Sequence, residues 1–271
     1  MLPAPLLVWS VAAVALATGF ALLFGWTRRR DNFGYVDVGW AAAFTVIAAW
    51  FAVTGPAPGW RRVLVLAAVA SWSLRLALHL ARRIAAHHPV EDARYTALRR
   101  AWADRLDLKM RLFFQGQAVS VLVLAWPLFA ITRNPAPSWL PLEILGVGVV
   151  LLAIAGEAVA DAQLRAFQRR HPDRREVCAE GLWRYSRHPN YFFEWLVWIG
   201  FALWAWPAPG GPVGLASPAL MLFLLLKVTG IRYTEEQLER SKGAAYLRYR
   251  ARTSAFVPWP PRDRAAPPPC L

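Results

Sequence analysis

The sequence predicts an all-α integral membrane protein with about seven transmembrane helices. Hydrophobic residues make up 57% of the 271 residues, the mean hydropathy is positive at +0.31, and seven separate segments are long and apolar. A transmembrane helix needs about 20 mainly apolar residues in a row, and soluble domains rarely contain several such runs. The segments are 5–25, 36–54, 63–81, 112–131, 139–160, 190–206 and 213–231, and the sixth is the shortest.

The domain organisation follows from what lies between these segments. No long polar stretch could fold as a separate soluble domain, so residues 1–260 are expected to form a single membrane domain. The end, 261–271, is rich in Pro and is expected to be disordered. The first residues lack a basic n-region and read as an anchor helix rather than a cleaved signal. Cys178 and Cys270 show neither a disulfide framework nor metal-ligand spacing, so no metal is predicted.

The distribution of Lys and Arg predicts the orientation. Outside the seven segments, 26 of these residues lie on one side of the membrane, and only Arg61, Arg62 and Arg133 lie on the other. The positive-inside rule then places the N-terminus outside and the C-terminus in the cytoplasm. Because the net charge of +14 follows this alternation of loops, it indicates attraction to anionic lipid headgroups and not nucleic-acid binding.

Polar and ionisable groups near the cytoplasmic ends of the segments are the first candidates for a functional site, because burying a charge in lipid costs about 2.5–3.5 kcal/mol or more. We find no comparable group in the outer half of any segment, which predicts one polar site open to the cytoplasm and argues against a transport path. The residues are Asp37, Arg75, His79, Glu157, Asp161, Asn190, Glu194, Lys227 and Arg232.

Two groups of these residues have a helical spacing. Glu157, Asp161 and Arg165 recur every four residues, which suits a local ion-pair stripe as well as a ligand site. Asn190 and Glu194 are also four apart, directly after Pro189, which suits the first position of a helix. The positive end of that helix, preceded in "GLWRYSRHPNYFFEWL" by Arg184, Arg187 and His188, would attract either a phosphate group or lipid headgroups.

Two cytoplasmic segments have helical patterns. The loop "HHPVEDARYTALRRAWADRL" predicts an amphipathic helix with Tyr95, Leu98, Trp102 and Leu106 on one face, mainly structural in role. The tail "RYTEEQLERSKGAAYLRYRARTSAFVPWPP" predicts another helix, whose Tyr246, Tyr249 and Arg250 are either interfacial residues or ligand contacts. The GxGxxG, Walker and HExxH motifs are absent from the sequence.

These motifs resemble the steroid 5-alpha-reductase superfamily, in particular an uncharacterised bacterial membrane branch of it. "RHPNYFFE" is the most specific match, and the weaker matches are "DVGW", "WSLRLALHLARR", "EDARY", "ADAQLRAF" and "YLRYRARTSAFVPW". Together they span roughly residues 33 to 260. The resemblance implies a seven-helix enzyme of lipid metabolism in the bacterial inner membrane, with its active site facing the cytoplasm. The protein is expected to be a monomer that is in contact with membrane lipids.

The resemblance also implies the activity and the site. Family members use NADPH to reduce a carbon–carbon double bond, conjugated to a carbonyl, in a lipophilic substrate taken from the bilayer. Asn190 and Glu194 would hold the nicotinamide end of the cofactor, with Glu194 among the catalytic residues. The remaining cofactor contacts would be Asp161, Arg165, Arg187, His188, Tyr246, Tyr249 and Arg250.

The resemblance is weakest at the catalytic donor. The Gln-Glu pair and the Tyr of the animal steroid reductases have no obvious match in this sequence. Reduction needs a donor that stabilises negative charge on the substrate carbonyl oxygen. A protonated Asp37 would qualify if burial raised its pKa, and His79 is the second candidate.

A rival resemblance has to be kept beside this one. Isoprenylcysteine carboxyl methyltransferases and related phospholipid methyltransferases also have an "RHPxY" element and a cytoplasmic tail like "TEEQLERSKGAAYLRYR". That likeness implies a methyltransferase that binds S-adenosylmethionine. Asn190, Glu194 and the "DVGW" and "EDARY" blocks favour the reductase.

Overall fold

The apolar segments of the sequence fold into long helices. A computed structural model describes residues 4–172, 176–228 and 230–262, and it contains helices and one isolated bridge, between Ser186 and Ser254, in this part of the chain. The all-α fold class is therefore confirmed. The Pro-rich end from residue 263 and Cys270 lie outside the described residues.

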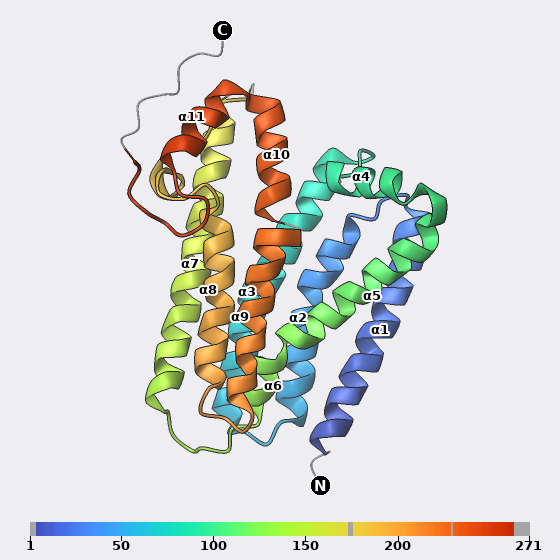
Figure 1. Cartoon of the computed structure of the whole chain (residues 1–271). Helices are drawn as coiled ribbons and strands as arrows, with labels where there is room; N and C mark the ends of the chain where they lie inside the picture. Colours follow the sequence, from blue (N-terminus) through green and yellow to red (C-terminus); the bar gives the residue numbers. More distant parts are fainter. Residues whose placement is uncertain (1–3, 173–175, 229, 263–271) are drawn as a thin grey trace. The chain divides into compact units, whose positions relative to one another are not determined.

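Figure 1 labels the helices in chain order. The first half contains α1 (Pro5–Arg29), α2 (Tyr35–Thr54), α3 (Gly59–His87), α4 (Ala93–Ala101), η1 (Ala103–Arg105), α5 (Leu106–Leu124) and α6 (Trp126–Thr132). The second half contains α7 (Pro141–Arg170), η2 (Gly181–Arg184), α8 (Pro189–Ala205), η3 (Gly211–Leu215), α9 (Ala216–Phe223), the π-helical turn η4 (Leu224–Val228), α10 (Ile231–Lys242) and α11 (Ala244–Arg252).

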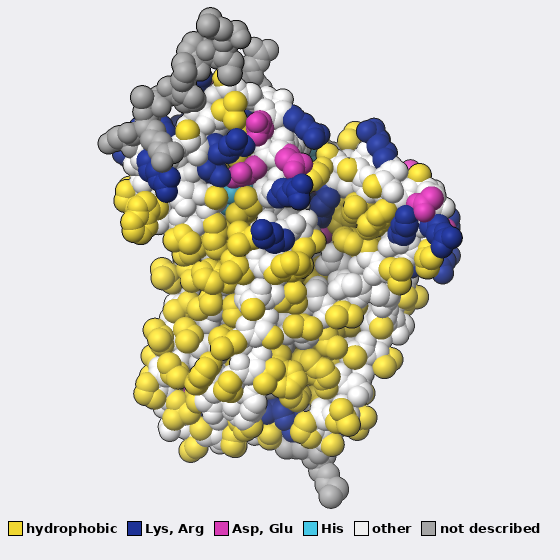
Figure 2. Space-filling model, viewed as in Figure 1, with side chains coloured by type: hydrophobic (Ala, Val, Ile, Leu, Met, Phe, Trp, Pro, Cys, Tyr) yellow, Lys and Arg dark blue, Asp and Glu magenta, His cyan; other side chains and the backbone are white. Residues whose placement is uncertain are grey.

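Six helical stretches have the length and composition to cross a membrane, counted over the described residues: Pro5–Arg29, Tyr35–Thr54, Gly59–His87, Ala103–Thr132, Pro141–Arg170 and Gly211–Lys242. They contain six of the seven predicted segments, apart from residues 139 and 140 of the segment 139–160, so this is an integral membrane protein. Hydrophobic side chains cover the long helices in Figure 2, as expected for surfaces in contact with lipid. The remaining segment, 190–206, forms α8, which has 17 residues and is shorter than the usual span of about 20. Seven crossings and the orientation stay predictions.

Several helices differ from the predicted segments at their ends. The segment 139–160 becomes α7, which continues for another ten residues to Arg170, because polar residues prolong the helix beyond its apolar part. The segment 112–131 is interrupted at Ala125, and Pro127 lies in the first turn of α6. Such a position needs no backbone N–H, so the Pro starts a new helix there. The predicted tail helix is two helices, α10 and α11, separated by Gly243 at a φ of 51°. Only glycine adopts that conformation without strain.

The chain divides into two compact units, and we describe each by itself. Unit 1 comprises Met1–Gly146 and Phe201–Ser217, and unit 2 comprises Val147–Gly200 and Pro218–Leu271. A single domain over residues 1–260 stays a prediction.

Unit 1 packs α2 against α3 and α1 against α5 around buried aromatic side chains, including Phe44, Phe51, Trp72 and Phe114. At one end, a fully buried Arg61 on α3 pairs with an equally buried Glu143 on α7, through two contacts of 2.9 Å. The sequence reading missed this pair: Glu143 lies inside the segment 139–160, so the statement that no ionisable group occupies the outer half of any segment was wrong.

Unit 2 packs α7 against α8 very closely at Gly156. A Cβ placed there would lie 2.4 Å from the ring of Phe193 on α8. Phe167, in the last turns of α7, forms a small buried cluster with Cys178 and Trp183, and the Trp183 indole N–H donates to the Ala160 carbonyl at 2.9 Å. This packing fixes the segment that leads into α8, which carries the predicted site residues.

We expect Gly156→Ala to lower the free energy of unfolding by about 1–3 kcal/mol, because the added methyl must push Phe193 or α8 away from α7. Gly148→Ala, on the same helix, is the matched control: its Cβ would meet nothing within 4 Å. It should be neutral, or stabilising by up to about 1 kcal/mol through helix propensity. Thermal unfolding of the detergent-purified variants measures both, and equal effects would contradict the tight packing at Gly156.

Candidate functional site

The segment Ser186–Pro189 leads into α8 and is held by the chain's C-terminal part. The Ser186 hydroxyl donates to the Phe256 carbonyl at 2.8 Å and accepts the His188 backbone N–H at 3.1 Å. The Arg187 backbone N–H donates to the Ser254 carbonyl at 2.8 Å. Pro189 is the first residue of α8, as predicted. The "RHPN" element is thus fixed in place by residues some 70 positions later in the chain.

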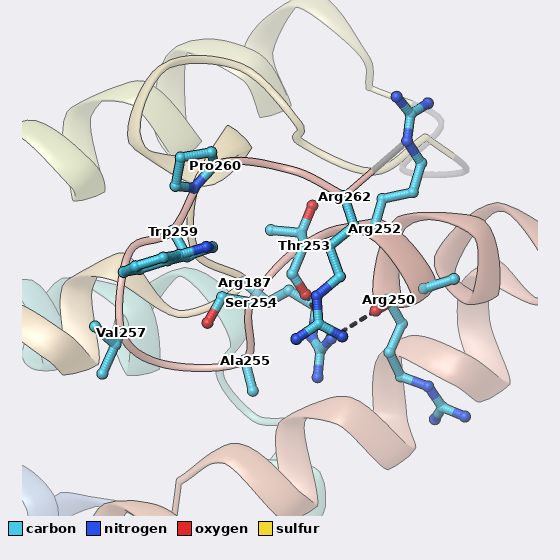
Figure 3. Close-up of a pocket in the computed structure, with 11 residues that line it drawn as sticks. Arg187, Arg250, Arg252, Thr253, Ser254, Ala255, Val257, Trp259, Pro260 and Arg262 are labelled. Atoms are coloured by element: carbon cyan, nitrogen blue, oxygen red, sulfur yellow. Dashed lines mark hydrogen bonds between the residues drawn. The ribbon is translucent and has the colours of Figure 1, made fainter. Parts of the chain in front are cut away.

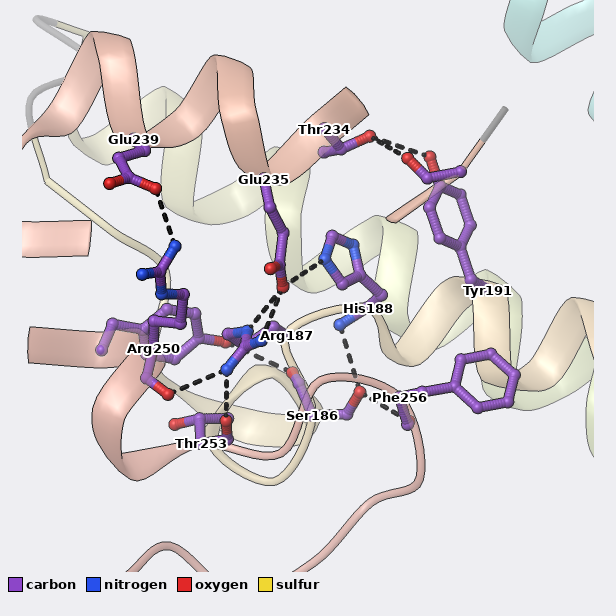
Figure 4. A network of polar contacts seen from close by, with 12 residues as sticks. Ser186, Arg187, His188, Tyr191, Thr234, Glu235, Glu239, Arg250, Thr253 and Phe256 are labelled. Atoms are coloured by element: carbon purple, nitrogen blue, oxygen red, sulfur yellow. Dashed lines mark hydrogen bonds and ion pairs between the residues drawn. The ribbon is translucent and has the colours of Figure 1, made fainter. Parts of the chain in front are cut away.

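Arg187 lies at the centre of a polar network in unit 2, shown in Figure 4. Its guanidinium pairs with Glu235 on α10 at 2.7 Å and donates to the carbonyls of Arg250 and Thr253, both at 2.8 Å. His188, which is 2% exposed, lies 3.3 Å from the same Glu235 carboxylate. Two of the three residues before α8 that were predicted to attract a phosphate, Arg187 and His188, are therefore already engaged with an acid of the protein. Their main observed role is to tie α8, α10 and α11 together.

A cavity of about 400 Å³ lies beside this network (Figure 3). Its wall is rich in arginine, and none of the described residues that line it is acidic. It is lined by Arg187, Arg250, Ala251, Arg252, Thr253, Ser254, Ala255, Val257, Trp259, Pro260 and Arg262. Backbone and hydroxyl groups and one large aromatic ring complete the wall. Such a composition suits an anion that carries a flat ring.

The acids and the amide form a second group, on the facing sides of α7 and α8. Glu157 and Asp161 on α7 are 4% and 9% exposed, and Glu194 on α8 is 7% exposed. The Asn190 amide donates to Asp161 across the helix pair at 3.5 Å, and the Trp198 indole N–H donates to Glu194 at 3.3 Å. The predicted sharing of one site by Asp161, Asn190 and Glu194 is thus compatible with the geometry. Arg165 does not join them: it is exposed and makes no ion pair with a described residue.

The tail residues have distinct environments. Tyr246 is fully buried, and burial together with the Glu235 carboxylate raises the pKa of its hydroxyl. The Tyr249 hydroxyl donates to the carbonyls of Trp183 and Ser186, and burial raises its pKa as well. Arg250 is exposed and pairs with Glu239 at 2.7 Å. Of these three residues, only Arg250 lines the cavity.

The two predicted donors, Asp37 and His79, lie in unit 1. Asp37 pairs with Arg94 and accepts the Tyr95 hydroxyl at 2.7 Å, so the "DVGW" and "EDARY" blocks meet. Tyr95 is fully buried, and burial, strengthened by the Asp37 carboxylate, raises the pKa of its hydroxyl. Asp37 serves as the acceptor in both contacts, whereas the hypothesis requires it to donate a hydrogen bond. His79 is half-buried on α3.

Sequence reasoning missed four contributors in unit 2. Glu235 was visible as an acid in a basic tail, but its partner Arg187 is 48 positions away. Arg252, Trp259 and Arg262 line the cavity. The first two lie in the matching block "YLRYRARTSAFVPW", but none of the three was predicted as a site residue. The only available signal was the dense alternation of arginine and aromatic residues in "YLRYRARTSAFVPWPPR".

Comparison with known families gave one match. The sequence profile of a family described as "Protein of unknown function (DUF1295)" matches residues 23–253. No curated protein and no solved structure matches the chain significantly. The matched range contains both the acid and amide group on α7 and α8 and the network around Arg187.

Proposed function

The chain belongs to the DUF1295 family, and for this member we propose a membrane-embedded reductase that uses NADPH. Its substrate is a lipophilic molecule of the bilayer, such as a steroid-like or isoprenoid-like enone, and the bond reduced is the carbon–carbon double bond. The enzyme lies in the bacterial inner membrane with the cofactor site toward the cytoplasm, the side on which Lys and Arg are concentrated.

The observation that carries this proposal is the division of the polar groups in unit 2 into two chemically different sets. The acids and Asn190 on α7 and α8 offer hydrogen-bond acceptors, which suit the carboxamide and the ribose hydroxyls of a nicotinamide nucleoside. The arginine-lined cavity offers donors to phosphate and the Trp259 ring to a purine. "RHPNYFFE" supplies one residue to the cavity wall and two to the acid and amide group.

The chain's residues would bind and orient the reactants. NADPH, when bound, supplies the hydride. Asn190 and Glu194, held on one face of α8, would fix the nicotinamide end, and Arg252 and Arg262 would neutralise the phosphates. Reduction places negative charge on the substrate carbonyl oxygen, where a donor is needed. Asp37 and His79, the two predicted donors, belong to unit 1, and their part in the reaction stays a prediction.

One observation favours the second candidate function, an S-adenosylmethionine-dependent methyltransferase. Glu157, Asp161 and Glu194 are three buried carboxylates on one helix pair, and such a group would attract the sulfonium and ammonium charges of that cofactor. The arginine-rich cavity favours the polyanionic NADPH instead.

Ligand-dependent thermal stabilisation separates the two functions. We expect NADPH at about one hundred times its dissociation constant to stabilise the purified protein by about 2.7 kcal/mol, and S-adenosylmethionine to have no effect. Arg262→Gln should weaken the effect of NADPH, because it removes a charge from the cavity wall. Arg248→Gln, at an exposed position of α11 outside the cavity, is the matched control. Stabilisation by S-adenosylmethionine alone would overturn the reductase.

A further inference from the structure

A second cavity, of about 830 Å³, lies wholly within unit 1, along α1 and α5. These two membrane-crossing helices lie side by side in Figure 1, and the Gln115 amide on α5 donates to the Ala17 carbonyl on α1 at 3.1 Å. We call this cavity the α1–α5 groove. It is lined by Ala21, Phe24, Gly25, Arg28, Arg29, Asp31, Phe33, Arg99, Leu106, Asp107, Arg111 and Gln115.

The rim of the groove carries an excess of positive charge. Two of its four arginines have acidic partners: Arg28 pairs with Asp107 at 2.7 Å, and Arg99 pairs with Asp31 at 2.9 Å. The other two, Arg29 and Arg111, have no acidic partner among the described residues. Arg111 is held over the Phe24 ring, 5.3 Å from its centroid. Two guanidinium groups therefore remain available to an anion at this rim.

The floor of the groove is apolar. Phe24 and Phe33 are 5% and 1% exposed and stack with their centroids 6.0 Å apart. Gly25 leaves the wall open, since a Cβ at this position would meet nothing within 4 Å. Leu22 on α1 and Leu112 on α5 are both largely exposed. The groove thus joins cationic groups at the helix ends to apolar surface toward the middle of the same helices.

We propose that the α1–α5 groove binds an anionic phospholipid of the surrounding membrane. Its phosphate is held by Arg29 and Arg111, and the first part of an acyl chain lies along Gly25 between the two helices. Basic pockets between transmembrane helices at the membrane surface suit anionic headgroups. The apolar continuation distinguishes a lipid from a soluble phosphate compound, which would leave the exposed Leu22 and Leu112 uncovered. This site is independent of the proposed NADPH site in unit 2.

Native mass spectrometry of the full-length protein, titrated with phosphatidylglycerol or phosphatidylcholine, tests the proposal. We expect phosphatidylglycerol to bind tightly at one site and phosphatidylcholine to bind weakly. Removing two charges with Arg29→Gln and Arg111→Gln together should weaken phosphatidylglycerol binding about 30-fold. The control removes two charges that are also exposed but lie outside the groove, with Arg100→Gln and Arg105→Gln. An equal loss in this control would overturn the proposal in favour of diffuse attraction.

A second pair of variants tests the apolar part without changing charge. Gly25→Leu should block the groove and weaken phosphatidylglycerol binding, whereas Gly19→Leu should leave it unchanged. Both glycines are on α1 with open space at the Cβ position, and Gly19 does not line the groove. Replacement of a helical glycine also favours the helix, so neither variant is expected to unfold. Retention of wild-type binding by Gly25→Leu, or displacement of the lipid by millimolar glycerol phosphate, would overturn the lipid site.

Discussion

Replacement of Glu143 by Leu is expected to lower the free energy of unfolding by about 3–5 kcal/mol, because Arg61 is then left buried without its counter-charge. Both side chains have no exposed area. Besides the two Glu143 oxygens, Arg61 donates to three backbone carbonyls, those of Ala136 at 2.6 Å, Ser138 at 3.0 Å and Asn134 at 3.3 Å. At about 2–4 °C per kcal/mol for a chain of this size, the midpoint of thermal unfolding should fall by roughly 10 °C.

The double variant Arg61→Met with Glu143→Leu separates two causes of lost stability: the unpaired charge of Arg61 and the loss of the hydrogen bonds that Arg61 donates to backbone carbonyls. Replacing both members of a buried pair by apolar residues is often neutral. Here recovery should be only partial, because the carbonyls that Arg61 satisfies would lose their donor. A Glu143→Leu protein that unfolds within 1 °C of the parent chain would show that the pair contributes nothing to stability. Full recovery in the double variant would assign the whole effect to the stranded charge.

The same pair shows how far the sequence predicts this fold. Long apolar runs predicted where six long helices lie, because burial in lipid leaves few alternatives to a helix. The helix ends were less predictable: α7 continues to Arg170 on polar residues that keep the helical spacing after the apolar pattern stops. Arg61 and Glu143 are 82 positions apart, and no local pattern indicates that one will meet the other.

The candidate site was also only partly predictable from the sequence. The i, i+4 spacing of Asn190 and Glu194 is a local property, and it correctly predicted that they share a helix with Pro189 at its start. The role of Arg187 was not readable locally, because its partners lie 48 to 66 positions later. A basic residue before a helix suggests an anion from outside the chain. Here an acid and two carbonyls of the chain occupy its donors.

Replacement of Arg187 by Ala is expected to lower the free energy of unfolding by about 3 kcal/mol or more. Its side chain is 10% exposed and that of Glu235 is 16% exposed, so Glu235 would lose its closest charged partner and keep the longer contact with His188. The carbonyls of Arg250 and Thr253 would lose their donor at the same time. Arg184→Ala is the matched control, since Arg184 is exposed and makes no ion pair with a described residue. It should change stability by less than about 0.5 kcal/mol.

Arg187→Lys separates charge from geometry. Lysine keeps the positive charge beside Glu235 but cannot reproduce the planar fork that reaches an acid and two carbonyls together. We therefore expect only partial recovery of stability relative to Arg187→Ala. If lysine restored stability fully, charge alone would account for the role of Arg187.

The consequence for NADPH follows from the position of Arg187 in the cavity wall. Since its donors are engaged with the chain, it would act on the cofactor by holding Arg250–Ser254, which line the same cavity. Arg187→Ala should then weaken NADPH-dependent stabilisation by displacing this segment, and Arg187→Lys, which retains the charge, should not restore it fully. Unchanged stabilisation by NADPH in both variants would separate the network from the cofactor site and leave Arg187 a purely structural residue of unit 2.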